Sequence, residues 1–522
     1  MNANKNRVKF AIIGAGSVSF CPATVADILL SEPFSQLDEL EIHLMDIREE
    51  ALAVSRHYCA QMAARLGRNV TLRASADLAA AVYGADFVVT AVEVNRYHYW
   101  SQDFHIPRRY GFRQIYGENG GPGGMFHALR NLPPLLGVAR EMERGCPGAW
   151  LLNYSNPEAK LVEAVSKLTR VKAVGLCHGE QMGMDQLALF LRMPKERIAA
   201  SPVGLNHFGW FTRVWDKETG EDLYPRLREL EKTAAPLAHW DEYALSRIML
   251  RTYGLWPYPG ANHIGEYFAW SDGFLASAGL QFYFDPASEN PWEAKQPPGF
   301  VYSLSGDPTG RPLYAETGEA SDAAEAANTA NTAEAANTAK AANTAKAADV
   351  AEAANATEAA DAAEAANTTE AANAADSANR GDGYAARFDA GKKALRASGE
   401  YGIPIAEAIF FDRTARIGAV NMPNRGYAAD LPEGMAIELP ALADGGGIHP
   451  EQCDPLPVAA AAMISLQGAI HKLLIEAYAE QSRKKLLQAV LLDPTVSGYA
   501  NAVAMINDLC ELQKDILPPL YW

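Results

Sequence analysis

No apolar run in the sequence approaches the roughly 20 residues that a bilayer-spanning helix needs. Residues 1–7 are polar and lead directly into an apolar segment, which does not resemble a secretory signal peptide. Cysteine is scarce as well, because six residues spread over a chain of 522 do not form the dense framework of a disulfide-stabilised protein. These absences predict a cytoplasmic protein without a membrane partner.

Positively charged residues are also fewer than negatively charged ones. The 46 lysines and arginines are outnumbered by 63 aspartates and glutamates, so the formal net charge is −17. Nucleic acids and anionic membranes are bound through basic surfaces, so this balance argues against both as partners. Hydrophobic residues make up 48% of the chain, which is ordinary for a globular protein with a sizeable core.

Residues 319–379 differ in kind from the rest of the chain. They repeat variants of Glu-Ala-Ala-Asn-Thr-Ala and contain almost no large apolar side chains. Such a segment cannot bury enough surface to offset the entropy that ordering it would cost. We interpret it as a low-complexity insertion into a folded domain, with patterned sequence resuming near Tyr384.

Short apolar runs alternate with helical patterns through the first part of the chain. Strand-like runs lie at 8–16, 40–46, 70–74, 85–92, 149–157 and 171–179. This alternation predicts crossover connections and a parallel sheet. We therefore expect an α/β fold with a Rossmann-like, doubly wound domain at 1–200. An α+β domain for substrate, metal and oligomer contacts would follow at 201–522, with long helices at 458–492.

A glycine turn follows the first expected strand and precedes the first expected helix. Gly14, Gly16 and Ser17 lie in this turn, where glycines permit a tight bend and close approach of a pyrophosphate to the helix N-terminus. Ser19 replaces the third glycine of the usual fingerprint, so the match is partial. Asp46 ends the second strand, where an acidic side chain would bind ribose hydroxyls and favour NAD over NADP. The alternative is a glycine turn that binds nothing.

Three short polar motifs follow this region. They are Asn-Tyr-Ser-Asn-Pro at 153–157, Cys-His-Gly-Glu at 177–180 and Gly-Leu-Asn-His at 204–207. The first two end expected parallel strands, whose carboxyl ends lie at one edge of a sheet. The Cys177 thiolate and the His207 imidazole suit Mn, Fe, Co, Ni or Zn, with positions left open for substrate oxygens. Taken alone, a Cys–His pair is more often structural.

The combination of motifs resembles glycoside hydrolase family 4, the NAD- and manganese-dependent glycosidases. The resemblance covers the glycine turn, the three polar motifs, and the segments 117–124, 263–267 and 422–440. It implies an α-glycosidase on the fold of lactate and malate dehydrogenases, with NAD and Mn²⁺ or another divalent transition metal as cofactors. A homodimer or homotetramer acting on a small glycoside is implied as well. In this family NAD oxidises carbon 3 of the sugar, elimination and water addition follow, and the hydride is returned.

The resemblance also implies roles for residues in the polar motifs. Cys177 and His207 would bind the metal, and Asn153 and Asn156 would contact the sugar. His178 would donate a proton to the leaving oxygen.

The catalytic base is less well defined by the resemblance. Glu118 matches an acid that raises the basicity of the base in relatives. Relatives carry a Tyr or Asp near the segment 263–267, but here neither residue directly precedes His263. Tyr267, His263 and Tyr258 therefore remain candidates, and a purely structural role for Tyr267 is equally compatible with the sequence.

The residue after Cys-His tracks the substrate in this family. Gly179 at this position implies α-glycosides of uronic acids, with α-galacturonides preferred over α-glucuronides, whereas α-galactosidases and α-glucosidases carry other residues. An anionic substrate needs a cationic partner, which Arg96, Arg108 or Arg109 could supply.

Two other classes of protein would share part of this pattern. An NAD-dependent 2-hydroxy-acid dehydrogenase would produce NADH in stoichiometric amounts and would leave Cys177 and His207 without a task. A non-catalytic NAD-binding sensor would bind the cofactor without turning over sugars.

Overall fold

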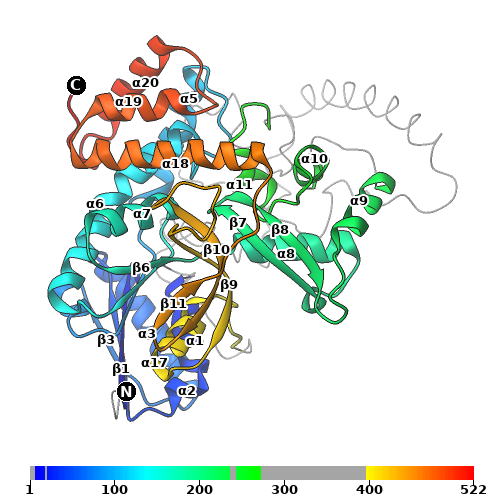
Figure 1. Cartoon of the computed structure of the whole chain (residues 1–522). Coiled ribbons are helices and arrows are strands. Elements are labelled where there is room, and N and C mark those ends of the chain that lie inside the picture. The colour runs from blue at the N-terminus through cyan, green and yellow to red at the C-terminus, as the bar shows by residue number, and fades with distance from the viewer. Residues whose placement is uncertain (1–5, 18–19, 235–242, 272–394) are drawn as a thin grey trace, which may run out of the picture.

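The computed structural model describes residues 6–17, 20–234, 243–271 and 395–522, and every structural statement below refers to these ranges (Figure 1). The low-complexity segment 319–379 and Tyr384, where patterned sequence is expected to resume, lie outside them.

The first half of the chain alternates strands with helices. Its strands are β1 (Arg7–Ile13), β2 (Glu39–Met45), β3 (Thr71–Ser75), β4 (Phe87–Thr90), β5 (Trp150–Asn153) and β6 (Lys172–Gly175). Its helices are α1 (Phe20–Leu30), α2 (Glu32–Ser35), α3 (Glu49–Arg65), α4 (Leu78–Val82), α5 (Arg96–Arg109), α6 (Gly121–Gly145), α7 (Glu158–Leu168) and α8 (Gly179–Leu191). The strands run parallel in the order β3-β2-β1-β4-β5-β6, as in doubly wound dinucleotide-binding sheets. The predicted α/β, Rossmann-like fold is confirmed.

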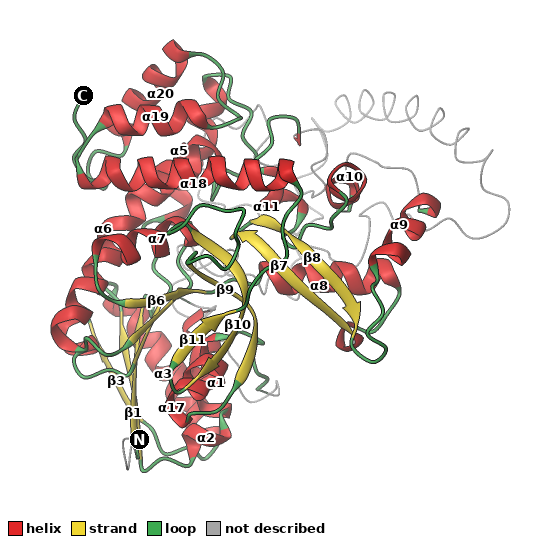
Figure 2. Cartoon of the chain, in the orientation of Figure 1, coloured by secondary structure: helices red, strands yellow, loops and turns green. Residues whose placement is uncertain are grey.

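The later strands extend the same sheet with antiparallel pairing. They are β7 (Ile198–Leu205), β8 (Phe208–Asp216), β9 (Ala415–Pro423), β10 (Ala436–Asp444) and β11 (Gly447–Pro450). The sheet continues β6-β9-β10-β7-β8, and β11 pairs with β10 off this path, so that Figure 2 shows one band of strands ending in the β7–β8 hairpin. Residue 200 falls inside β7, so the division into domains at 1–200 and 201–522 stays a prediction.

The helices of the second half are α9 (Tyr224–Thr233), α10 (Ala244–Tyr253), α11 (Ala261–Gly265), α17 (Gly402–Phe411), α18 (Val458–Ala479), α19 (Arg483–Leu492) and α20 (Tyr499–Leu512), preceded by the single-turn helix η1 (Lys195–Arg197). The long helices expected at 458–492 are therefore α18 and α19. In Figure 1, α18 lies between the strands and the pair formed by α19 and α20.

One row of paired residues crosses from the parallel to the antiparallel half of the sheet. Gly175 of β6 pairs with Asn421 of β9, and Asn421 pairs with Glu438 of β10. Glu438 in turn pairs with Gly204 of β7. These four residues are paired in one unbroken row. The position of the end of β6 is therefore fixed relative to the end of β7.

The central strand β1 is apolar along its length because both of its faces are covered. Phe10 and Ile12 point into a core shared with α1, α3 and α17. Ala11 and Ile13 point to the opposite face, into a core shared with α6, α18, α19 and α20. Successive strand residues face opposite sides of a sheet, so a strand covered on both sides needs a continuous apolar run.

Helix α18 is long and apolar enough to cross a membrane by length and composition alone, with a mean hydropathy of 1.6. However, 44% of its most apolar 18-residue stretch is buried inside the fold. Ile470 and Leu474 in this helix belong to the core that also contains Ala11 and Ile13. A core helix passes the same test, so this feature is weak evidence for a membrane span.

A buried polar network attaches the C-terminal helices to the first half of the chain. The guanidinium of Arg130 in α6 donates to Asp103 Oδ2 of α5 at 2.8 Å and to Gln513 Oε1 at 3.0 Å. The Gln513 amide closes the triangle by donating to Asp103 Oδ1 at 2.8 Å. All three side chains are buried, so each depends on the other two for its hydrogen bonds.

We predict that Asp103→Ala lowers the free energy of unfolding by about 3–5 kcal/mol, because it leaves the Arg130 charge buried without its carboxylate partner. Urea denaturation monitored by circular dichroism measures the change. The control is Glu141→Ala, which breaks an exposed ion pair with Arg144 and should cost less than about 1 kcal/mol. Equal effects of the two substitutions would contradict this account of the network.

Candidate active site

The glycine turn packs against the ends of β2 and β4. The amides of Gly14 and Ala15 both donate to the Met45 carbonyl at 2.9 Å. Gly14 has a φ of +86°, and a Cβ at this position would lie 2.3 Å from the Ala91 carbonyl oxygen. Only glycine therefore permits this backbone path.

Asp46 holds the same turn from the end of β2. Its Oδ2 accepts the Gly16 amide at 2.7 Å, and its Oδ1 accepts the Arg48 amide at 2.8 Å. Ser17 Oγ then accepts the Phe20 amide at 3.2 Å at the start of α1. The residues predicted to bind the dinucleotide thus lie together, with Asp46 bonded to the turn that contains Gly14, Gly16 and Ser17. The Asp46 carboxylate keeps lone pairs for further donors such as ribose hydroxyls.

The ends of β5 and β6 lie side by side, since the Leu176 amide donates to the Asn153 carbonyl at 2.9 Å. The buried Asn153 side chain accepts from Thr90 Oγ1 at 2.9 Å and from the Ser155 amide at 3.2 Å, and it donates to the Ser155 carbonyl at 3.0 Å. These bonds turn the amide toward the protein, and its predicted contact with a sugar stays a prediction. The Asn156 carbonyl accepts from Asn131 at 2.8 Å.

Cys177 and His207 meet although 30 residues separate them. Cys177 lies two residues beyond the end of β6, and His207 lies in the two-residue loop between β7 and β8. The distance from Cys177 Sγ to His207 Nε2 is 3.6 Å. His207 has a φ of +65°, a left-handed conformation that is uncommon outside glycine and is often associated with functional sites. The hairpin register therefore brings together the two donors that the sequence predicts.

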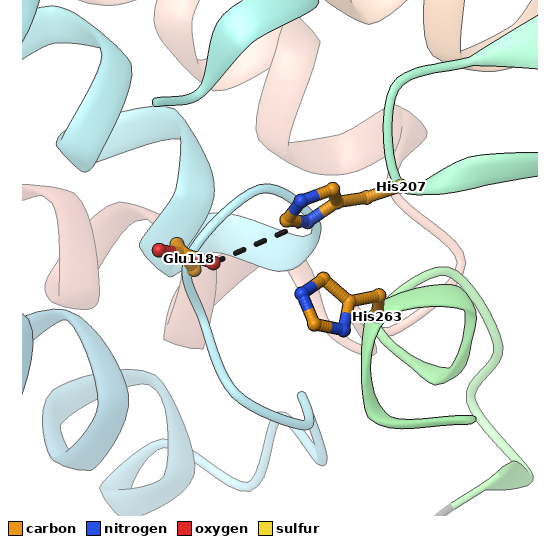
Figure 3. Close-up of side chains that lie close together, drawn as sticks. All are labelled: Glu118, His207 and His263. Carbon is orange, nitrogen blue, oxygen red and sulfur yellow. Dashed lines mark ion pairs between the residues drawn. The ribbon is translucent and has the colours of Figure 1, made fainter. Parts of the chain in front are cut away.

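Other candidate donors surround the opposite edge of the His207 ring. Glu118 Oε2 and Glu266 Oε1 each lie 4.0 Å from His207 Nδ1, and the Asn119 amide nitrogen lies 3.0 Å from it. The ring of His263 stands edge-on to that of His207, with centroids 4.1 Å apart. Figure 3 shows Glu118, His207 and His263 converging, and one ligand atom from each lies within 4.8 Å of the others. A second possible donor set therefore shares His207 with Cys177.

The chemistry of Cys177 and His207 fits a metal ion. Burial, with the charges of His263 and Lys160, lowers the pKa of His207 well below its usual value, so the imidazole is neutral as a ligand must be. Burial, with Glu438 and Glu158, raises the pKa of the Cys177 thiol well above its usual value. A coordinated thiol is deprotonated, so a cation bound here would release a proton.

A chain of ion pairs supports Glu118. Arg96 pairs closely with Glu118 Oε1 and lies 3.6 Å from Glu93 Oε2, while its guanidinium stacks over Trp100. His127 Nε2 lies 2.7 Å from Glu93 Oε2. Sequence analysis did not single out Glu93 or His127. Glu93 lies three residues after the end of β4. This position near the carboxyl end of a parallel strand is the sequence feature that could have identified it.

His178 follows Cys177 and is the N-cap residue of α8. Its Nδ1 lies 2.6 Å from Glu400 Oε1, and its side chain is 53% exposed. The hydrogen bond to Glu400 raises the pKa of His178 against the opposing effect of burial. The imidazole is therefore better able to carry a proton near neutral pH, as a general acid requires.

The candidate bases occupy different surroundings. Tyr267 is buried with its ring stacked on Phe208, at a centroid distance of 4.3 Å. The Tyr258 hydroxyl lies 2.5 Å from the Leu205 carbonyl oxygen and 2.9 Å from Glu438 Oε2, so it is engaged in structural bonds. His263 lies beside His207. Tyr267 and His263 remain the predicted bases.

Comparisons with known proteins agree with this fold. Residues 9–193 match the model of the family 4 glycosyl hydrolases, and residues 202–496 match the model of the family's C-terminal domain. An α-glucosidase of Erwinia rhapontici is 29% identical over 509 residues, covering 96% of both chains. An α-galactosidase of Bacillus subtilis is 34% identical over 260 residues, covering 50% of this chain and 59% of the relative.

A solved structure of a 6-phospho-α-glucosidase from gut microorganisms, described as a complex with NAD and Mn²⁺, has a similar fold. Its TM-score is 0.69 at 20% identity, covering 99% of this chain and 100% of that one. The strand order defines a Rossmann-like α/β protein, and the two family matches make it an enzyme of the glycosidase class. The chain belongs to family 4 of the glycosyl hydrolases. It is therefore a glycosidase, and the dehydrogenase and sensor interpretations are set aside.

The partners that surround Glu93 lead to a prediction about how the stability of the fold depends on pH. Burial raises the pKa of Glu93, but His127, Arg96 and Arg130 outweigh it and hold the pKa at about 2 instead of 4.5. A depressed pKa stabilises the fold above pH 4.5, and that contribution of about 3 kcal/mol is lost as the pH falls toward 2. The stability difference between the wild type and Glu93→Gln should shrink by this amount between pH 5 and pH 2.

Urea denaturation at a series of pH values measures this difference. The control is Glu511→Gln, which alters an exposed side chain that is 73% accessible. A stability difference for Glu93→Gln that does not change with pH would show that the carboxylate charge is not held by these partners.

Proposed function

We propose that this chain hydrolyses α-glycosides with NAD and a divalent transition metal, Mn²⁺ first, as cofactors. The observation that carries the proposal is the 3.6 Å approach of Cys177 Sγ to His207 Nε2. Both the glycine turn after β1 and Cys177 after β6 lie at the carboxyl edge of one parallel sheet, where such folds bind their ligands. The similar 6-phospho-α-glucosidase structure is described with both NAD and Mn²⁺.

When bound, NAD accepts and returns a hydride at carbon 3, and the divalent ion polarises the neighbouring sugar oxygens. Cys177 and His207 would hold the ion. His178, oriented by Glu400, would protonate the leaving oxygen. Tyr267 or His263 would remove the proton at carbon 2 once that carbon is acidified.

Two further residues of the predicted site act around this centre. Glu118, fixed by Arg96, would place a negative charge beside the base. Asn153, the last residue of β5, and Asn156, in the loop before α7, would contact the sugar.

For the sugar, we put α-galacturonides first. Gly179 occupies the position that tracks the substrate, and a Cβ there would meet nothing nearer than 3.9 Å. Packing therefore does not demand a glycine, and the missing side chain leaves room beside Cys177. Helix α8 begins at Gly179, and the positive end of a helix dipole favours an anionic group such as a carboxylate.

A neutral α-galactoside or α-glucoside is the second candidate. The Arg96 charge is already balanced by Glu118 and Glu93, and Arg108 donates to the Gln114 carbonyl at 3.0 Å. Two of the three arginines predicted to clamp a carboxylate, Arg96 and Arg108, therefore have other partners. An α-glucosidase and an α-galactosidase are among the similar proteins.

The proposed assembly is a homodimer or homotetramer in the cytoplasm. Tyr499 and Leu512 of α20 are 66% and 51% exposed, and α19 ends with exposed Leu491 and Leu492. A contact between protein copies would bury exposed apolar side chains such as these.

A substrate panel with NAD and Mn²⁺ tests the proposal. We expect kcat/KM for an α-galacturonide to exceed that for the matching α-galactoside by about tenfold, the equivalent of one charged hydrogen bond. Chelation of the metal or removal of NAD should abolish turnover of every substrate. A preference for the galactoside would favour the second candidate. Turnover that survives both chelation and cofactor removal would overturn the mechanism.

A further inference from the structure

A short stretch of chain, which we call the 398–402 segment, leads into α17 and is bonded at both ends. The Ser398 amide donates to Asp27 Oδ1 of α1 at 2.7 Å, and the Ser398 hydroxyl donates to the other oxygen of that carboxylate. At the opposite end, the Gly402 amide donates to the Tyr154 hydroxyl, just after β5, at 3.1 Å. Helix α17 itself packs against α1 (Figure 1). The segment is therefore tied to the first half of the chain.

Two residues between these ends face the start of α8. Glu400 Oε1 lies 2.6 Å from His178 Nδ1. The next residue, Tyr401, donates its hydroxyl hydrogen to Glu180 Oε2 at 2.9 Å. Only Gly179 separates the two partners on α8, so two short stretches of backbone meet at two adjacent points. A shift of Glu400 away from His178 would therefore also pull Tyr401 away from Glu180.

The contact between Glu180 and Tyr401 is the buried member of this pair. Glu180 Oε2 also accepts from the Gln181 side chain at 2.8 Å, and Gln181 Nε2 lies 2.5 Å from the Tyr401 hydroxyl oxygen. A Cβ on Gly418 of β9 would lie 2.3 Å from that hydroxyl oxygen, so the sheet packs directly against it. A buried carboxylate is costly unless hydrogen bonds replace its lost water. Glu180 and Tyr401 therefore depend on each other.

The contact between Glu400 and His178 decides how the imidazole ring is oriented. Glu400 Oε1 is buried and has no other hydrogen-bond partner among the described residues. A carboxylate oxygen accepts and does not donate, so a proton on Nδ1 of His178 is favoured. The His178 side chain is 53% exposed. Its other ring nitrogen, Nε2, is then the one that can give a proton to a bound molecule.

We propose that Glu180 is a positioning residue for the general acid. Its bond to Tyr401 holds the 398–402 segment against the start of α8. Glu400 in that segment then faces Nδ1 of His178, which leaves Nε2 to protonate the leaving oxygen. The inference rests on the proposed function, in which His178 is the acid. It gives the last residue of the Cys-His-Gly-Glu motif a role that the reaction itself does not assign.

The substitution Tyr401→Phe tests this role, because it removes the hydroxyl group that bonds to Glu180 and keeps the ring. A poor leaving group needs a general acid more than a good one does. We therefore compare kcat for methyl and p-nitrophenyl α-galacturonide in the presence of NAD and Mn²⁺, or for the matching galactosides if the substrate panel favours them. We expect Tyr401→Phe to lower kcat for the methyl glycoside about tenfold more than for the nitrophenyl glycoside, the equivalent of one hydrogen bond.

The matched control is Tyr110→Phe. It removes another tyrosine hydroxyl that donates to a carboxylate, that of Asp508, and should leave both rates as in the wild type. A loss of equal size on both glycosides in Tyr401→Phe would show that this hydroxyl serves packing alone, and it would overturn the inference. Wild-type rates on both glycosides would overturn it as well.

Two substitutions of Glu180 keep the test decisive if Tyr401→Phe folds poorly. Glutamine keeps an oxygen that can accept from Tyr401 and Gln181, whereas alanine removes it. Glu180→Gln should therefore stay near the wild type in its preference between the two glycosides, and Glu180→Ala should show the extra loss on the methyl glycoside. The reverse order would contradict a role that depends on this acceptor.

Nitrogen NMR of the histidine-labelled chain, without substrate or cofactor, locates the ring proton independently of activity. At a pH where the imidazole is neutral, the wild type should carry the proton of His178 on Nδ1, and Tyr401→Phe should move part of it to Nε2. The signal is assigned by its loss in His178→Ala. A proton on Nε2 in the wild type would overturn the inference even if no variant folds.

His178→Ala separates a failure of this inference from a failure of the proposed function. If His178 is the acid, its removal lowers kcat for the methyl glycoside about 100-fold more than for the nitrophenyl glycoside, and adding Tyr401→Phe changes this ratio no further. A selective loss in His178→Ala but not in Tyr401→Phe would overturn the role of Glu180 and leave the acid in place. No selective loss in His178→Ala would remove the acid itself, and the inference with it.

Discussion

The row of paired residues that joins the two halves of the sheet is the constraint on which the site depends. Gly175 on β6 and Gly204 on β7 are linked through Asn421 and Glu438 on the two strands between them. A shift of one residue in any of the three antiparallel pairs would turn every side chain of that strand to the other face. The distance between the ends of β6 and β7, and with it the meeting of Cys177 and His207, is therefore a property of strand register.

The same row of paired residues places two acidic side chains beside the site. Burial raises the pKa of Glu438 to about 7, and it raises that of Glu158 as well. The Asn421 amide donates to Glu158 Oε2 at 3.1 Å, so both carboxyl groups lie near the middle of the row. In their ionised forms, both groups add to the burial that raises the pKa of Cys177. Acidic groups gathered around a thiol disfavour a free thiolate but favour a cation bound to it, which is the property that a metal site needs.

Much of this arrangement could be predicted from the sequence, and the missing parts have a physical reason. The glycine turn, Asp46 and the strand-end motifs could be predicted to lie close together. The reason is that the carboxyl ends of parallel strands lie at one edge of the sheet. The meeting of Cys177 with His207 was implied by resemblance to a family and not by spacing, since antiparallel pairing across β9 and β10 brings them together. Those strands follow the low-complexity insertion, so no local pattern could reveal their register.

Glu93 and Glu266 were missed for a related reason. Glu93 bonds to His127, and Glu266 accepts the backbone amides of residues 118–120, so both depend on partners that are distant in sequence. The predicted sugar contact of Asn153 shows the opposite case, because its motif was evident while its side-chain bonds are internal. Sequence motifs identified the residue types of the site, whereas tertiary contacts decide what each one can do.

X-ray absorption at the manganese K-edge of the Mn²⁺-loaded chain tests the central claim most directly. If Cys177 and His207 hold the ion, the extended fine structure contains one sulfur scatterer in the first coordination shell. A shell of nitrogen and oxygen alone would place the ion with Glu118, His207 and His263 and would contradict the account.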